Sequence, residues 1–194
     1  MSEEPAASPP SERTGERATD RTTERIDDRP TDRTSERAIE RERARAILDL
    51  QEGRGTVQLL GDVGIAELLR SSHRIAVVGA SSNQHRPSNG VFWYLKRAGF
   101  DAVPVNPNER EVHGVAAFPD LRTALEATGT FDIVDVFRRP EACEPVAEDA
   151  VAIGARAIWF QLGVVNWNAA RIAAAGGLQV VMDRCTAIEH RRFV

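Results

Sequence analysis

The sequence has little of what disulfide-bonded, metal-binding and membrane-spanning proteins depend on. Its 194 residues include two cysteines and no CxxC motif, which is too few for a disulfide scaffold. The four histidines are scattered along the chain, so no metal site is predicted. No apolar run reaches the roughly 18 residues of a membrane span, and the N-terminus lacks the apolar segment of a secretory signal. We therefore expect a cytoplasmic protein with reduced thiols and no membrane partner.

The sequence also lacks a large excess of positive or negative charge. The chain carries 25 Lys and Arg against 29 Asp and Glu, for a net charge of −4. This balance excludes the broad basic surface of most nucleic-acid-binding proteins. The only lysine is Lys96, inside a predicted helix, so the sequence contains no Walker A motif for nucleoside triphosphates.

The beginning of the chain differs in composition from the rest. An arginine recurs at every fourth position from Arg13 to Arg45, and each but the last follows an Asp or Glu. This segment has no apolar stripe to bury, so residues 1 to about 36 are predicted to be a disordered, charge-balanced tail. Composition favours a helix from about Ser35 to about Gly53. The tail is either an arm that binds a partner or nucleic acid or, as the pairing of acids with arginines favours, a solvated segment with no specific partner.

Three regions follow from this composition: the tail at 1–46, which becomes helical towards its end, a linker at 47–61 and a folded domain at 62–194. In the domain, buried apolar runs predict five strands, at 74–80, 101–106, 131–137, 155–161 and 178–183. Helical segments separate these strands, and that alternation is typical of an α/β protein with a doubly wound, mostly parallel sheet covered by helices on both faces.

Local signals place the ends of several helices in the domain. Asp62, Asp120 and Asn166 are predicted N-caps, and Pro140 is predicted to open a helix in the first-turn position that proline favours. A short further strand is expected at 116–118. Core packing is predicted for all three tryptophans, Trp93, Trp159 and Trp167.

The loop after the first predicted strand has the composition of a phosphate site. Small residues from Gly79 to Ser82 let a ligand approach the backbone, and the following helix offers free N–H groups. Arg86 adds a permanent positive charge. No GxGxxG occurs here, and the second strand ends at Asn106 without the acid that binds a ribose hydroxyl, which argues against an ordinary dinucleotide site. Alternatively, the glycine and serines are only turn residues.

Five motifs, one at each strand end, resemble those of a known family. They are IAVVGASSNQHRPS, then VPVNPNE with HGV after it, FDIVDVFRRPE, AIWFQLGVVN and GLQVVMDRC. The domain at 62–194 resembles the CoA-binding domain family, the small stand-alone proteins related to the N-terminal domain of the succinyl-CoA synthetase alpha subunit. The resemblance implies a Rossmann-like fold that holds coenzyme A (CoA) by its nucleotide part.

The resemblance also implies a set of ligand-binding residues at the strand ends. Those that would surround the pyrophosphate, ribose and phosphates are Gly79, Ala80, Ser81, Ser82, Asn83, Arg86, Pro87 and Ser88. Those that would flank the adenosine, the opposite wall and the pantetheine arm are, in that order, Asn106 and Pro107; Phe137, Arg138 and Arg139; and Gln161, Leu162 and Gly163. The related ligases tend to have a lysine just past the proline of the second loop, whereas here Asn108 and Glu109 follow Pro107.

The sequence shows no constellation that indicates catalysis. The related ligases use a phosphohistidine in a second domain and an ATP-binding partner subunit, and we expect neither domain within 194 residues. His85 lies in the phosphate loop and could contact a phosphate or be a plain surface residue. Asp132 and Asp135 are predicted to face opposite sides and so form no acid/base pair. Cys185 follows Arg184 and could be reactive, although a small buried cysteine that closes the sheet is favoured.

The leading prediction is a non-catalytic module that binds the small molecule CoA or an acyl-CoA, with a homodimer possible and any protein partner unknown. One alternative is a subunit of an ADP-forming acyl-CoA synthetase that works with a separate ATP-grasp partner. The other is a NAD(P)-binding redox sensor, against which the missing GxGxxG motif counts.

Overall fold

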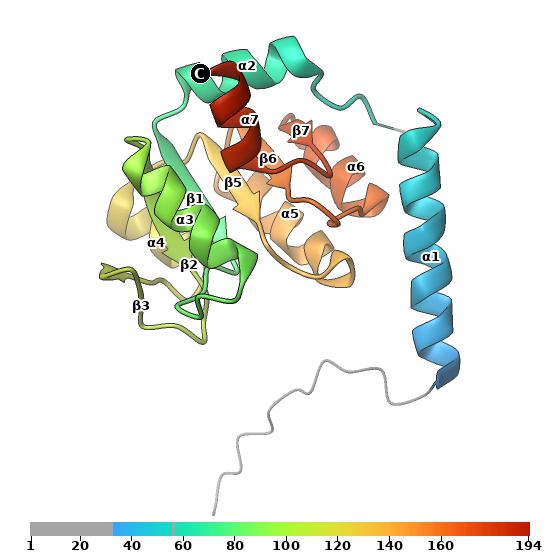
Figure 1. Cartoon of the computed structure of the whole chain (residues 1–194), viewed down its shortest axis with the longest axis horizontal. Helices are drawn as coiled ribbons and strands as arrows, with labels where there is room; N and C mark the ends of the chain where they lie inside the picture. The colour runs from blue at the N-terminus through green and yellow to red at the C-terminus, as the bar shows by residue number, and fades with distance from the viewer. Residues whose placement is uncertain (1–32, 56) are drawn as a thin grey trace, which may run out of the picture.

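Five parallel strands form the central sheet of the protein (Figure 1). The computed structural model describes residues 33–55 and 57–194. The strands lie in the order β2-β1-β5-β6-β7, so the order reverses between β1 and β5. Their bounds are Arg74–Val78 for β1, Asp101–Val105 for β2, Ile133–Val136 for β5, Ala157–Phe160 for β6 and Gln179–Val181 for β7. This arrangement confirms the predicted α/β, Rossmann-like fold. In doubly wound sheets, ligands bind beyond the carboxyl ends of the strands, at the point where the strand order reverses.

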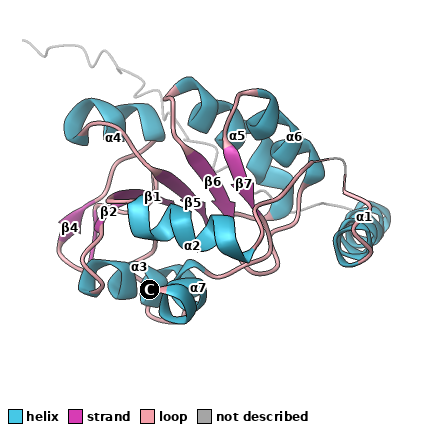
Figure 2. Ribbon diagram, turned by 90° about the horizontal axis from the view of Figure 1, so that it is seen from above, coloured by secondary structure: helices cyan, strands magenta, loops and turns pink. Residues whose placement is uncertain are grey.

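Helices cover both faces of the sheet (Figure 2). One face packs against α4 (Leu121–Thr128), α5 (Cys143–Ala152) and α6 (Trp167–Ala175), and a 3₁₀ turn at Pro140–Ala142 leads into α5. The other face is covered by α2 (Asp62–Ser71), α3 (Pro87–Arg97) and α7 (Thr186–Phe193). Successive strand residues point to opposite faces, so each strand contributes to both apolar layers. No helix among the described residues combines the length and the apolar character that crossing a bilayer requires.

Several local predictions need correction. The N-cap of α2 is Gly61, because the Asp62 carboxylate instead pairs with Arg184 and Arg192. The segment expected to be a loop with a short strand is a hairpin of β3 (Glu111–Val112) and β4 (Val115–Ala116). Helix α7 was not predicted. Trp93 is 47% exposed, because it lies on the outer side of α3 and stacks on His113.

Helix α1 (Arg33–Gln51) precedes the domain and is attached to it by side chains. Arg43 donates two hydrogen bonds to Glu141, from Nε to Oε1 at 2.6 Å and from Nη2 to Oε2 at 2.8 Å. Trp167 Nε1 donates to the backbone oxygen of Ala46 at 3.1 Å. The helix therefore begins inside the segment predicted to be disordered and crosses the expected boundary at residue 46. The rest of that predicted tail, residues 1–32, lies outside the described residues.

Both edges of the sheet carry backbone hydrogen bonds to other segments. At β2, Phe118 N–H donates to the Pro104 oxygen at 3.0 Å, and Asn106 N–H donates to the Phe118 oxygen at 2.8 Å. Pro104 itself has no N–H to leave unpaired. At β7, Leu60 N–H donates to the Val180 oxygen at 2.9 Å. The two edge strands are thus partly covered by the chain itself.

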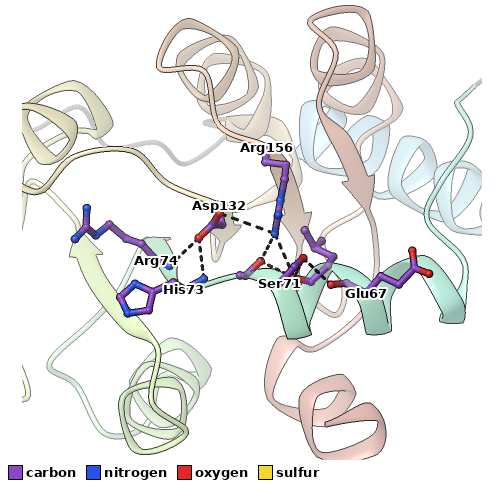
Figure 3. Close-up of polar contacts among 8 residues, drawn as sticks. Glu67, Ser71, His73, Arg74, Asp132 and Arg156 are labelled. Carbon is purple, nitrogen blue, oxygen red and sulfur yellow. Dashed lines mark hydrogen bonds and ion pairs between the residues drawn. The ribbon is translucent and has the colours of Figure 1, made fainter.

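The amino ends of the strands are closed by paired polar groups (Figure 3). Asp132 accepts hydrogen bonds from the backbone N–H groups of His73, at 2.8 Å, and Arg74, at 3.0 Å. Partial burial opposes ionisation of Asp132, but these N–H groups outweigh it and lower the pKa. Arg156 lies 3.9 Å from the same carboxylate and donates to Ser72 Oγ at 2.7 Å. This cluster joins α2, β1, β5 and β6 at the end of the sheet opposite the candidate site.

Candidate ligand-binding site at the carboxyl ends of the strands

A cavity of about 610 Å³ opens at the carboxyl ends of the strands. The loops after β1, β2, β5 and β6, the start of α3 and the residue that precedes α7 surround it. Its lining consists of Gly79, Ser81, Arg86, Pro87, Ser88, Val91, Asn106, Asn108, Glu109, Phe137, Arg138, Gln161, Leu162, Val164 and Cys185. The volume lies within the range of about 300–1,000 Å³ that is usual for small-molecule sites.

Gly79, at the end of β1, allows the loops after β1 and β5 to approach each other. Its φ is +85°, in the left-handed region that favours glycine. A Cβ at this position would overlap the backbone oxygen of Phe137. Gly79 N–H donates to the Val105 oxygen at 2.8 Å, and Phe137 N–H donates to the Val78 oxygen at 2.8 Å. The floor of the cavity therefore depends on the absence of a side chain here.

Two arginines bring positive charge into the cavity. Arg86 is exposed and is the N-cap residue of α3, and Arg138 is half-buried in the loop after β5. Within 33–55 and 57–194, neither guanidinium forms an ion pair with a carboxylate. The first turn of α3 has no side-chain cap either. Unpaired cations beside an uncapped helix start form a suitable site for an anion.

Hydrogen bonds join the loop after β1 to the loop after β2 and to α3. Asn106 Nδ2 donates to the Ala80 oxygen at 2.7 Å, and Asn89 Nδ2 donates to the Ser81 oxygen at 2.8 Å. One oxygen of Glu109 accepts from Ser81 Oγ at 2.9 Å and from the Ser82 N–H at 3.0 Å. The sequence did not indicate Glu109 as a site residue. The acid that binds a ribose hydroxyl is expected at the end of the second strand, whereas Glu109 lies in the turn that follows.

A buried carboxyl group lies behind Gln161, which lines the cavity. Asp135 is fully buried in β5, and it accepts hydrogen bonds from Gln161 Nε2 at 2.8 Å and from the Thr186 hydroxyl at 2.9 Å. Gln161 Nε2 also donates to Thr186 Oγ1 at 2.8 Å. Burial raises the pKa of Asp135 to about 7, although both hydrogen bonds favour the charged form. Asp132 and Asp135 share no hydrogen-bond partner: Asp132 accepts from backbone N–H groups, and Asp135 accepts from two side chains.

Comparison with known proteins agrees with this geometry. Residues 73–191 match the family described as the CoA binding domain. This chain belongs to that family. Among curated proteins, the uncharacterized protein YneT of Bacillus subtilis (strain 168) is 40% identical over 126 residues, which make up 65% of this chain and 91% of YneT.

Solved structures with the same fold include two relatives of this CoA-binding domain protein. A hypothetical protein from Pyrococcus horikoshii OT3 has 36% identity and a TM-score of 0.65, over 69% of this chain and 92% of that one. The protein called cell-free ID.343 from Thermus thermophilus has 31% identity and a TM-score of 0.64, over 70% of this chain and 100% of that one.

The cavity of the CoA-binding domain brings together ten of the sixteen residues that the resemblance implies. They come from all four implied segments, which are 79–88, 106–107, 137–139 and 161–163. The ten residues are Gly79, Ser81, Arg86, Pro87, Ser88, Asn106, Phe137, Arg138, Gln161 and Leu162. The resemblance did not supply five further lining residues, Val91, Asn108, Glu109, Val164 and Cys185. Three of these, Asn108, Glu109 and Val164, lie one or two residues from implied segments, so proximity in sequence could have indicated them.

The remaining six implied residues do not line the cavity: Ala80, Ser82, Asn83, Pro107, Arg139 and Gly163. Ala80 is fully buried, and its oxygen is taken by Asn106. Asn83 Oδ1 accepts from the His85 N–H at 2.9 Å, which shapes the loop from within. Gly163 N–H donates to Asp183 at 2.7 Å. In these three cases the polar groups support the loops of the site.

The two cysteines occupy different environments in this CoA-binding domain. Cys143 is fully buried in α5, and burial raises the pKa of its thiol to about 12. Cys185 is half-buried, is the N-cap residue of α7 and lines the cavity. The expectation that Cys185 is buried and closes the sheet is therefore wrong, because β7 ends at Val181 and a turn carries Cys185 to the cavity.

Proposed function

We propose that this CoA-binding domain protein binds CoA or an acyl-CoA through its nucleotide part, as a binding module without turnover of its own. The observation that carries the proposal is the pair Arg86 and Arg138, which line one cavity and pair with no carboxylate of the described residues. CoA carries a pyrophosphate and a 3′-phosphate. The planar guanidinium of arginine suits phosphate oxygens and stays charged at neutral pH.

The rest of the cavity supports the same ligand. Gly79 leaves the backbone open to close approach, and Ser81 and Ser88 are small neighbours. Phe137 and Leu162 add apolar surface to the lining for the pantetheine arm or the adenine, and Leu162 is 58% exposed. A lining that contains both cationic and apolar residues suits the two chemically different parts of CoA.

The proposed lack of turnover rests on the character of the lining. The described lining residues include no histidine, and their one acid, Glu109, is held by Ser81 and Ser82. General acid/base catalysis needs a group that is free to transfer a proton to a reacting atom. The arrangement therefore supports binding more than chemistry.

Calorimetric titration with CoA tests the proposal. The wild-type protein should bind CoA saturably, and Arg138→Ala should weaken binding by about tenfold or more, because a charge-assisted hydrogen bond to phosphate is lost. Arg97→Ala, which removes an exposed arginine at the far end of α3, is the matched control and should bind like the wild type. Binding of NAD but not of CoA would overturn the proposal.

A further inference from the structure

The anion site implied for the ligand already holds a carboxylate of the chain itself. Glu109 lies in the turn after β2, and its Oε1 reaches the loop after β1. This single oxygen accepts hydrogen bonds from the hydroxyl of Ser81 and from the backbone N–H of Ser82. Both donors belong to the loop that would face the pyrophosphate of CoA: Ser81 lines the cavity, and Ser82 follows it directly in the chain. A phosphate that bound these two donors would compete with the carboxylate, because two negative charges held at the same donors repel each other.

Glu109 is ionised at neutral pH. The hydrogen bonds from Ser82 and Ser81 hold the pKa of its carboxyl group below the usual range. Among the described lining residues it is the one carboxylate, and no ion pair joins it to Arg86 or Arg138. The cavity therefore contains two unpaired cations, while the hydroxyl of Ser81 and the N–H of Ser82 are occupied by an internal anion.

The side chain of Glu109 can leave without disrupting the fold. It is half-buried, and the turn that carries it has its own hydrogen bonds. Asn108 N–H donates to Asn106 Oδ1 at 3.0 Å, and Glu109 N–H donates to the Asn106 oxygen at 3.2 Å. A change of rotamer at Glu109 would free Ser81 and Ser82 and preserve the turn.

We propose that Glu109 is an internal competitor of the ligand's phosphate: a phosphate that enters the cavity displaces its carboxylate from Ser81 and Ser82. This inference rests on the proposed function and assigns a specificity-determining residue to the same cavity. The displacement costs free energy for every phosphorylated ligand. Additional contacts can offset this free energy, and CoA would make them through its adenosine and pantetheine parts. Simple phosphates lack such contacts and are therefore disfavoured.

The test compares Glu109→Gln with Glu111→Gln, using inorganic pyrophosphate as the probe. Glu111 is exposed, lies two residues away in β3 and does not line the cavity, so its variant controls for the change in net charge. Glu109→Gln should bind pyrophosphate about tenfold tighter than the wild type, because the competing anion is gone. Glu111→Gln should bind it like the wild type. The backbone amide signal of Ser82 in NMR spectra should shift on pyrophosphate binding.

The outcomes separate this inference from the proposed function. Equal or weaker pyrophosphate binding by Glu109→Gln, or no binding by any variant, overturns the role of Glu109. Weaker binding would mean that Glu109 assists the ligand. Tighter pyrophosphate binding without any CoA binding by the wild type would overturn the proposed function alone. Glu109→Ala is the second variant, and thermal melting of each protein checks that the fold is intact.

Discussion

The two ends of the sheet use arginine in opposite ways. At the amino ends of the strands, Arg74 donates to Asp101 Oδ2 at 2.6 Å and also to the backbone oxygen of Thr128. Arg156 donates to Ser72 and lies beside Asp132. At the carboxyl ends, Arg86 and Arg138 line a cavity and have no carboxylate partner among the described residues. The same residue type joins segments of the fold at one end and lines a cavity without a carboxylate partner among the described residues at the other.

This difference separates stability from binding within one small domain. Charges that find partners inside the chain contribute to folding, whereas unpaired charges at a cavity contribute only when a ligand arrives. Asp135 adds a third case, because it lies towards the carboxyl end and is buried, so its charge opposes folding. Substitutions at these three kinds of site should therefore have distinct effects.

The largest effect is expected at Asp135. With its pKa raised to about 7, the folded protein keeps a proton that the unfolded chain releases near pH 4. The contribution of Asp135 to the free energy of unfolding is fully present below about pH 4. It is lost as the pH rises through about 7, and the free energy of unfolding falls by up to about 1.4 kcal/mol per pH unit. Asp135→Asn cannot titrate, so in urea unfolding its stability relative to the wild type should rise through this window. Parallel pH profiles of the two proteins would contradict the assignment.

A smaller effect on stability is expected at the amino ends of the strands. Asp132→Ala removes the acceptor for the His73 and Arg74 N–H groups, and the free energy of unfolding should fall by about 1–2 kcal/mol. Asp132→Asn keeps one acceptor oxygen and should lose less. Chemical denaturation measures the change, and CoA titration of Asp132→Ala should match the wild type. Weakened CoA binding would show that the two ends of the sheet are not independent.

The smallest effect on stability is expected at Arg86. Its side chain is exposed and unpaired, so Arg86→Ala should change the free energy of unfolding by less than about 0.5 kcal/mol. CoA binding by the same variant should nevertheless weaken. Denaturation and calorimetry on one preparation distinguish the two effects. Destabilisation comparable to that of Asp132→Ala would mean that Arg86 belongs to the structure of the fold.

Much of the fold was predictable because it follows from local patterns. Buried apolar runs located all five strands, and the predicted caps at Asp120 and Asn166 accept the N–H groups of Thr123 and Ala169. The cap at Asp62 was wrong because its partners, Arg184 and Arg192, lie more than a hundred residues away. Helix α7 is a short segment rich in charged residues, TAIEHRRF, so apolar periodicity did not reveal it.

The site was predictable where it follows directly from a strand end. Gly79, Arg86 and Arg138 lie at or near such ends, and the parallel sheet brings them to one cavity. Glu109 and Cys185 were not assigned to it, because their positions depend on the path of a turn through space. Which of two neighbouring arginines reaches the cavity likewise depends on the turn, so Arg138 lines it and Arg139 does not.

The covered edges of the sheet restrict how copies of this protein can assemble. A dimer formed by sheet extension needs a free edge strand whose N–H and C=O groups can pair with another chain. Here Phe118 occupies part of the edge at β2, and Leu60 occupies part of the edge at β7. At these covered positions a second copy could extend the sheet only if the segment around Phe118 or Leu60 moved away.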